Sequence, residues 1–268
     1  MNLTCKSCSN NAVEIFYELN DVPTQSVLNI ATREKALGFP RGKISLGFCH
    51  ECGFISNVAF DPELLEYDTG YEATQSYSGT FTEFARRQAR KLVDRYDLYD
   101  KDLVEIGCGN GEFLTLLCEM GNNRGIGFDP AYVAGRVVSM NNAEVRFVKD
   151  YYSEKYSDTR AHFLYCKMTL EHIDDVAGFV RMVRNSIGVE KDTAVFFQVP
   201  DVTRILYDCA FEDIYYEHCS YFSPGSLARL FRRSGFDVLG LETDYAGQYV
   251  MVDAKPDRAN VPATSLLE

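Results

Sequence analysis

The stretch VEIGCGNGEFL at residues 104–114 decides the fold. Three glycines, Gly107, Gly109 and Gly111, follow a short β-branched run at alternate positions, and Glu112 opens a stretch with helical apolar spacing. Glycines between a strand and a helix allow the backbone to approach a ligand closely at the carboxyl edge of a sheet. The stretch therefore predicts a ligand-binding loop that joins a strand to a helix.

The same loop is unsuited to a dinucleotide. The fingerprint G-x-G-x-x-G requires glycine at position 112, where this chain has Glu112. A carboxylate at the start of a helix repels the pyrophosphate that the positive helix end would attract. Asp129 closes the next predicted strand, 22 residues after Gly107, and an ionised carboxylate readily accepts a pair of hydroxyl hydrogen bonds. The pattern favours a cationic ligand without phosphates.

Short β-branched runs alternate with helical stretches through most of the chain. The predicted strands are Leu103–Ile106, Arg124–Phe128, Val145–Val148, His162–Cys166, Ala194–Val199, Val238–Thr243 and Tyr249–Val252. The predicted helices lie at 81–96, 112–120, 131–140, 174–186 and 226–234, and Asp61 opens a further capped helix. This alternation predicts an α/β fold with helices on both faces of a parallel sheet. Residues 244–248 form a link too short for a helical crossover, so the last two strands should form an antiparallel hairpin at one edge.

Composition places the chain among folded proteins. Of its 268 residues, 46% are hydrophobic and 25% are charged, which excludes disordered, collagen-like and coiled-coil chains. The formal net charge of −12 argues against nucleic acid or an anionic membrane as a partner. The amino end lacks an apolar signal core, and no apolar run approaches about 20 residues. We expect a cytoplasmic protein.

Four of the nine cysteines form two C-x2-C pairs, Cys5 with Cys8 and Cys49 with Cys52. Two such pairs can supply four thiolates to one tetrahedral zinc ion, and four cysteines leave no open position, so this zinc should be structural. A thioredoxin-like role is disfavoured because the first pair has no preceding strand. Buried or catalytic thiols, or His50 in place of one sulfur, are the alternatives. We expect the other five cysteines to be buried.

The E-x-G-x-G-x-G loop followed by Asp129 resembles that of the S-adenosylmethionine (SAM) dependent methyltransferases of the Rossmann-like class. The resemblance implies a Rossmann-like seven-stranded fold in which the loop wraps the methionine part of SAM and Asp129 binds the ribose hydroxyls. It also implies that Asp150, after the third strand, reaches the adenine amino group. The cofactor contacts implied in this way are Glu105, Gly107, Cys108, Gly109, Gly111, Phe128, Asp129, Asp150 and Lys167.

Family members often carry L-E-H after the fourth strand, as this chain does at 170–172, with that segment lining the cofactor cavity. A catalytic role for His172 is one interpretation of this motif. The alternative is that Glu171 caps a helix and His172 packs in the core.

A narrower resemblance rests on three features together: the two C-x2-C pairs, a Tyr-rich loop at 67–82, and the string IYYEHCSYF at 214–222. They are similar to those of the zinc-containing sugar C-methyltransferases that act on nucleotide-linked keto-deoxysugars. Forming a carbon–carbon bond from SAM requires a base that removes a proton beside a carbonyl and a group that stabilises the enolate.

The family match implies that His218 is this base. A histidine side chain suits the role because its ordinary pKa lies near neutrality. Tyr215 and Glu217 then orient the acceptor, and they share a face if the segment is extended. Tyr71 or Tyr77 closes over the site from the other side. The alternative is an aromatic cap in which His218 and Glu217 satisfy backbone groups.

We expect a zinc-binding domain at 1–60, a Tyr-rich loop and connecting helix at 61–100, a SAM-dependent methyltransferase domain at 101–255 and a linker-like tail at 256–268. Known relatives carry a further carboxyl-terminal domain that helps to hold the nucleotide sugar. Three explanations stay open: a truncated sequence, a second chain that supplies this surface, or a smaller acceptor.

The expected acceptor is a small molecule, a nucleotide-linked ketosugar and most simply a TDP-sugar. Two other functions fit the same motifs. One is an O- or N-methyltransferase in which His218 deprotonates a hydroxyl group. The other is a non-catalytic SAM-binding scaffold whose zinc module recruits a partner.

Overall fold

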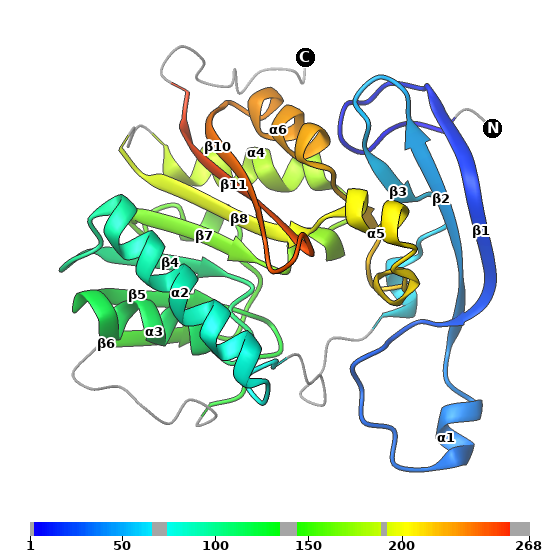
Figure 1. The fold of residues 1–268 in the computed structure, drawn as a ribbon, viewed down its shortest axis with the longest axis horizontal. Coiled ribbons are helices and arrows are strands. Elements are labelled where there is room, and N and C mark those ends of the chain that lie inside the picture. Colours follow the sequence, from blue (N-terminus) through cyan, green and yellow to red (C-terminus); the bar gives the residue numbers. More distant parts are fainter. Residues whose placement is uncertain (1–2, 66–73, 135–143, 189–191, 258–268) are drawn as a thin grey trace.

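The computed structural model describes residues 3–65, 74–134, 144–188 and 192–257. Its larger sheet has seven strands in the order β10-β11-β8-β7-β4-β5-β6 (Figure 1). The bounds are β4 (Asp102–Ile106), β5 (Arg124–Phe128), β6 (Glu144–Val148), β7 (Phe163–Lys167), β8 (Ala194–Pro200), β10 (Phe236–Asp244) and β11 (Tyr249–Pro256). The five strands from β4 to β8 run parallel, whereas β11 pairs antiparallel with both β8 and β10. The predicted α/β fold and its edge hairpin are confirmed.

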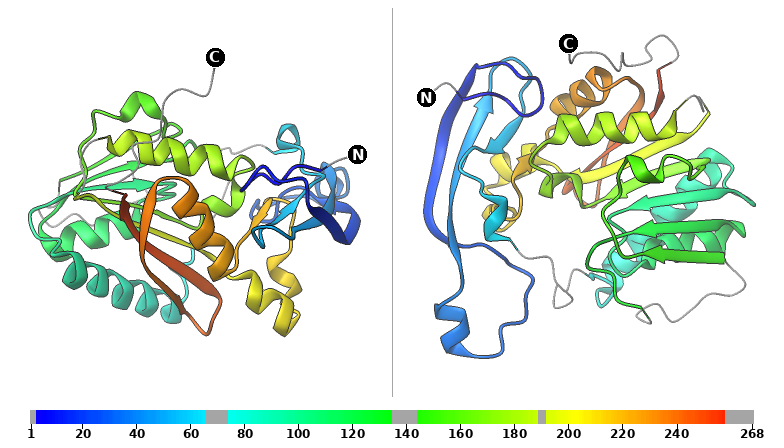
Figure 2. Two further views of the ribbon diagram at one scale, coloured as in Figure 1. Left: turned by 90° about the horizontal axis from the view of Figure 1, so that it is seen from above. Right: turned by 180° about the vertical axis from the view of Figure 1, so that it is seen from behind.

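Helices cover both faces of this sheet. Helices α2 (Gly79–Tyr96) and α3 (Glu112–Gly121) lie on one face, and α4 (Val176–Ile187) and α6 (Pro224–Arg233) lie on the other (Figures 1 and 2). Alternate residues of a strand point to opposite faces. In β7, Phe163 and Tyr165 therefore join the core with α2 and α3, whereas Leu164 and Cys166 join the core with α4 and α6.

A smaller antiparallel sheet stands beside the large one (Figure 1). Its strands are β1 (Val13–Pro23), β2 (Arg41–Cys49), β3 (Ile55–Asn57) and β9 (Ser220–Tyr221), and α1 (Arg33–Leu37) lies between β1 and β2 in the chain. Strand β9 pairs with β3 through Ser220 opposite Ser56 and Tyr221 opposite Ile55. The segment that follows β8 is therefore built into the amino-terminal sheet, together with α5 (Val202–Asp208) and the 3-10 turn η4 (Phe211–Asp213).

Several predicted details differ from the structure. The helix predicted to start at Asp61 is a single 3-10 turn, η1 (Pro62–Leu64). The helix predicted at 131–140 lies largely outside the described residues, and 131–134 are not helical. Strand β11 runs through Pro256, where the tail was expected to begin. Burial is confirmed for four of the five remaining cysteines and is wrong for Cys209, which is exposed.

Two further 3-10 turns, η2 (Glu154–Tyr156) and η3 (Leu170–His172), flank β7. The second of these carries the L-E-H sequence at the carboxyl edge of the sheet. Among the described helices, we find none with the length and apolar character that a membrane span requires.

Candidate active site

The glycine loop connects β4 to α3 at the carboxyl edge of the large sheet. All three glycines have positive φ values, +71° at Gly107, +52° at Gly109 and +80° at Gly111. A Cβ atom at Gly107 would lie 2.0 Å from Oγ1 of Thr169, and one at Gly111 would lie 2.2 Å from the Phe147 ring. A Cβ at Gly109 would meet nothing within 4 Å. The loop is therefore packed at both ends and open in the middle, where a ligand can approach its backbone.

Asp129 joins the loop to the end of β5. Its Oδ2 accepts a hydrogen bond from the backbone N–H of Gly109 (2.9 Å), and its Oδ1 accepts one from the N–H of Ala131 (2.8 Å). The N–H groups of Gly107 and Cys108 both donate to the carbonyl oxygen of Phe128 (2.9 and 3.1 Å). Burial raises the pKa of Asp129. The two strand ends that the sequence singled out thus form one structure.

Two titratable side chains, Glu105 and Lys167, lie beneath the loop. Glu105 is 3% exposed, and burial raises the pKa of its carboxyl group to about 8. Burial lowers the pKa of Lys167 to about 7, although the charge of Glu105 acts in the other direction. Lys167 Nζ donates to Gln88 Oε1 (2.5 Å) and lies 3.3 Å from the ring centroid of Phe113. This pair supports the floor of the loop.

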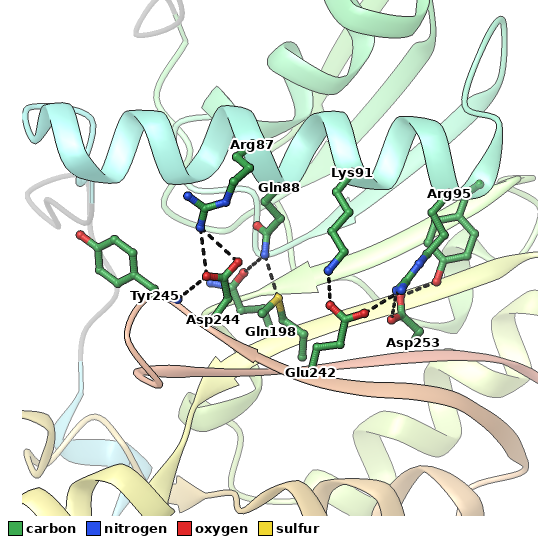
Figure 3. A network of polar contacts seen from close by, with 11 residues as sticks. Arg87, Gln88, Lys91, Arg95, Gln198, Glu242, Asp244, Tyr245 and Asp253 are labelled. Atoms are coloured by element: carbon green, nitrogen blue, oxygen red, sulfur yellow. Dashed lines mark hydrogen bonds and ion pairs between the residues drawn. The ribbon is translucent and has the colours of Figure 1, made fainter.

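Gln88 belongs to a polar network between α2 and the edge hairpin (Figure 3). Its amide nitrogen donates to Gln198 Oε1 at 2.6 Å. Farther along α2, Arg87 pairs with Asp244 (3.0 Å), and both Lys91 and Arg95 pair with Glu242. One feature of the sequence could have indicated Gln88: it is a polar residue on the apolar stripe of a helix.

Asp150 lies after β6, as expected, but its side chain already has partners. Its Oδ2 accepts a hydrogen bond from the hydroxyl of Tyr156 (2.7 Å) and forms an ion pair with Lys155. These two partners hold the pKa of Asp150 below its usual value.

On the acceptor side, the chain turns at Tyr216 and Glu217, so the extended arrangement on which a shared face of Tyr215 and Glu217 depended is absent. The turn instead brings Tyr215 and His218 together, with 2.5 Å between the Tyr215 hydroxyl and Nε2 of His218. Nδ1 of His218 lies 3.3 Å from the carbonyl oxygen of Asp213, to which it can only donate. In the neutral ring, Nε2 is therefore the unprotonated nitrogen. Burial, together with the neighbouring His172, lowers the pKa of His218 well below its ordinary value, so the expectation of a pKa near neutrality is wrong for this histidine.

Glu217 contacts the amino-terminal module, the part of the chain at residues 3–60 that carries β1, β2 and β3. Its Oε2 accepts two hydrogen bonds from Ser26, one from the backbone N–H (2.7 Å) and one from the hydroxyl (2.6 Å). Neither Ser26 nor Asp213 was identified from the sequence. Ser26 is distant in the chain, and the local pattern does not show that a turn brings the carbonyl oxygen of Asp213 to His218.

The L-E-H turn borders the same cluster. The rings of His172 and His218 lie 5.0 Å apart, and Ser220 Oγ donates to the carbonyl oxygen of Ile173 (2.8 Å). Thr169, one residue before this turn, is also the side chain that packs on Gly107. The candidate cofactor loop and the histidine cluster are therefore neighbours. Of the two candidate tyrosines, Tyr71 lies outside the described residues and Tyr77 is 88% exposed at the start of α2.

The four paired cysteines come together in the amino-terminal module. The sulfurs of Cys5 and Cys52 are 3.6 Å apart, as are those of Cys8 and Cys49, and all four lie within 4.8 Å of one another. A zinc tetrahedron with Zn–S bonds of about 2.3 Å has edges of about 3.8 Å, so the four thiols fit this ion. His50 contacts Glu14 (2.7 Å) and is outside the group.

A parallel sheet with a glycine loop after its central strand and an acid after the next one is the arrangement of a Rossmann-like cofactor site. A family model described as "Methyltransferase domain" matches residues 81–241. The chain belongs to this family, and its cofactor is SAM.

The C-methyltransferase NovU of Streptomyces niveus is 29% identical to the chain over 221 residues, which are 79% of this chain and 51% of NovU. The chain thus spans about half the length of this relative.

Solved structures agree on the fold. One is RosA of Streptomyces davawensis, an N,N-8-amino-8-demethyl-D-riboflavin dimethyltransferase, with a TM-score of 0.50 and 17% identity, covering 66% of this chain and 56% of RosA. Another is human N-acetylserotonin methyltransferase in complex with SAM, with a TM-score of 0.51 and 14% identity, covering 63% of this chain and 52% of that protein. The similarity covers the methyltransferase fold alone.

Proposed function

We propose that this chain methylates the carbon beside the ketone of a nucleotide-linked deoxysugar, most simply a TDP-sugar. The observation that carries the proposal is the neutral, buried imidazole of His218, which lies next to the L-E-H turn at the carboxyl edge of the sheet. A neutral imidazole with an unprotonated Nε2 is ready to accept a proton. Its similarity to a C-methyltransferase supports carbon as the methylated atom.

In this proposal His218 Nε2 removes the proton from the acceptor carbon, and the electron pair of the C–H bond passes into an enolate. The Tyr215 hydroxyl now bonded to Nε2 turns to the acceptor and donates to its oxygen. Glu217, held by Ser26, fixes the turn that carries both groups. Bound SAM supplies the methyl group.

The SAM site in this proposal is the open middle of the glycine loop. The backbone of Gly107, Gly109 and Gly111 faces the methionine part, with Glu105 and Lys167 as its buried support. Asp129 faces the ribose hydroxyls, and Asp150 faces the adenine with Cys108 and Phe128 nearby. Asp150 would have to release Lys155 or Tyr156 to do so.

We propose a structural zinc ion on Cys5, Cys8, Cys49 and Cys52, because the distances between their sulfurs fit a tetrahedral site. We also propose the division into a zinc-binding domain (1–60), a connecting segment (61–100) and a methyltransferase domain (101–255). Residues 201–222 pack with the zinc-binding domain and carry the proposed base.

Incubation with SAM and a TDP-ketosugar tests the function, with the product followed by mass spectrometry. We expect one added methyl group. His218→Asn should lower the rate by about 10²–10⁴-fold, the usual contribution of a general base, and leave SAM affinity unchanged.

Deuterium exchange from solvent into the acceptor without SAM identifies the methylated atom. Label at carbon supports enolate chemistry, whereas methylation of oxygen or nitrogen without carbon labelling would contradict the proposal. Unchanged turnover in His218→Asn would remove His218 as the base.

A further inference from the structure

Glu171 is a buried carboxyl group whose role is unexplained by the mechanism above. It is 1% exposed, and neither of its carboxyl oxygens has a hydrogen-bond partner among the described residues. A buried polar group without a partner destabilises the fold, and more strongly if it is charged. Such a group is expected where a function requires it.

Two histidines lie close to the Glu171 carboxyl group. One carboxyl oxygen of Glu171 and one ring nitrogen each of His172 and His218 all lie within 4.8 Å of one another. One bridging water molecule or a small side-chain rotation closes a gap of this size. Glu171 is thus within proton-transfer reach of the proposed base.

His218 has a difficulty that Glu171 resolves. The ring is 3% exposed, so the imidazolium formed when it takes a proton has little contact with water. Among the described residues, no lysine or arginine charge acts on the Glu171 carboxyl group. The one charge that acts on it is that of Asp213. Asp213 is itself paired with Arg204 (3.1 Å). Glu217 is held by Ser26 through its Oε2, so Glu171 is the carboxyl group of the cluster with both oxygens unpartnered among the described residues.

We propose that Glu171 is the proton sink of the base, so that the proton taken up by His218 passes to the Glu171 carboxylate. The inference rests on the function proposed above. The C–H electron pair stays on the acceptor as the enolate, the ionised carboxylate becomes a neutral acid, His218 returns to its neutral form, and the proton leaves to water after product release. Glu171 does not touch the acceptor. It is a positioning residue that acts through His218.

The protonation equilibria of the cluster fit this role. Burial raises the pKa of Glu171 to about 8 and lowers that of His172 to about 4, so a proton shared by the cluster resides on Glu171. The other titratable groups that face the cluster come from the turn and from both strands beside it. They are Tyr215, Glu217, Asp213, Tyr221, Cys166 and Cys219. Because the sink must start ionised, proton removal should rise with pH through the region near 8.

The same three side chains are also a donor set for a divalent metal ion. The hydrogen bonds argue against this occupant. Nε2 of His218 is bonded to Tyr215, its Nδ1 faces the carbonyl oxygen of Asp213, and the His172 ring is bonded to the backbone of Glu217.

The first test is an NMR titration of ¹⁵N-histidine-labelled protein from pH 6 to 9.5, which is independent of activity. We expect the ring nitrogens of His172 and His218 to report a step near pH 8 in the unmodified chain. Glu171→Gln should abolish the step and Glu171→Asp should keep it at a changed pH. Glu212→Gln removes an exposed carboxyl group nearby and should leave the step unchanged. A step that persists in Glu171→Gln, or is absent from the unmodified chain, overturns the proposal.

The second test is the pH profile of deuterium exchange into a TDP-ketosugar. Glu171→Gln should lower exchange about tenfold or more above pH 8 and flatten the profile, with SAM affinity unchanged. Equal exchange in both proteins overturns the proposal. If no ketosugar exchanges but the NMR step depends on Glu171, the proposed function fails and the proton coupling stands. Stoichiometric Zn²⁺ or Mn²⁺ binding that Glu171→Gln removes would make the cluster a metal site and overturn the inference.

Discussion

Ser26 and Glu217, 191 residues apart in the sequence, are joined by two hydrogen bonds to a single carboxylate oxygen. Ser26 lies in the amino-terminal module, and Glu217 lies in the turn that carries the proposed base. Hydrogen bonds to a buried carboxylate are stronger than those between neutral groups. This contact fixes the position of the turn relative to the module.

Ser26→Ala tests that contact. It removes the hydroxyl donor and keeps the backbone N–H, so we expect a loss of about 1.5–3 kcal/mol in the free energy of unfolding. The turnover number should fall while SAM affinity is retained, because Ser26 contacts the acceptor side only. Calorimetry and initial rates measure both quantities. Ser157→Ala, at an exposed serine, is the control, and equal turnover in the two variants would show that the contact does not position the base.

Two glycine substitutions separate folding from binding. Gly111→Ala places a Cβ 2.2 Å from the Phe147 ring, so we expect a clear loss of thermal stability. Gly109→Ala meets open space and should cost only about 1–2 kcal/mol from its positive φ, yet it should block the approach of SAM. Thermal unfolding and titration calorimetry with SAM distinguish the two effects. Full SAM affinity in Gly109→Ala would show that the cofactor does not bind at this loop.

Metal analysis tests the zinc site. We expect one zinc ion per chain by mass spectrometry, and Cys49→Ser should lose it together with thermal stability, since Cys5, Cys49 and Cys52 share a core with Phe54. Cys209→Ser, at an exposed cysteine outside the group, is the matched control. Zinc retained at full occupancy in Cys49→Ser would rule out the four-cysteine site.

Glu171→Gln should also change how stability depends on pH. The carboxyl pKa is raised from 4.5 to about 8 in the folded chain, so between these values the folded state binds more protons than the unfolded state. The contribution of Glu171 is therefore fully present below about pH 4.5 and is lost as pH rises towards 8, by at most about 1.4 kcal/mol per pH unit. Urea unfolding at several pH values should show that the free energy of unfolding of Glu171→Gln rises relative to that of the unmodified chain over this range. A constant difference would mean that Glu171 is already ionised at low pH.

The large sheet was predictable because each of its strands carries its own local signal. The run before Gly107 and the run before Asp129 are short, contain apolar residues and are followed by turn residues, and the structure has strands at both places. The amino-terminal sheet was not predicted. In β1 most side chains are exposed, so burial imposes no clear alternation on its sequence. Exposed strands of this kind lack the pattern on which prediction depends.

The arrangement of the candidate site was predictable only in part. Gly109 and Asp129 meet as expected, because the carboxyl ends of neighbouring parallel strands share one edge of the sheet. The pairing of Tyr215 with His218 depends on a turn at Tyr216, which the aromatic string at 214–222 does not predict. The contact with Ser26 depends on tertiary packing over a long sequence separation, for which a single sequence has no local signal.

The short pairing of β9 with β3 has a consequence for how this protein is assembled. Ser220 follows the proposed base by two residues, and Ser56 follows the second cysteine pair by four. The base therefore reaches its place only after segments from opposite ends of the chain have met. Contacts of such high sequence separation form slowly and lock together cooperatively. We expect the amino-terminal module and the acceptor site to fold and unfold as one unit, so that neither can be transplanted without the other.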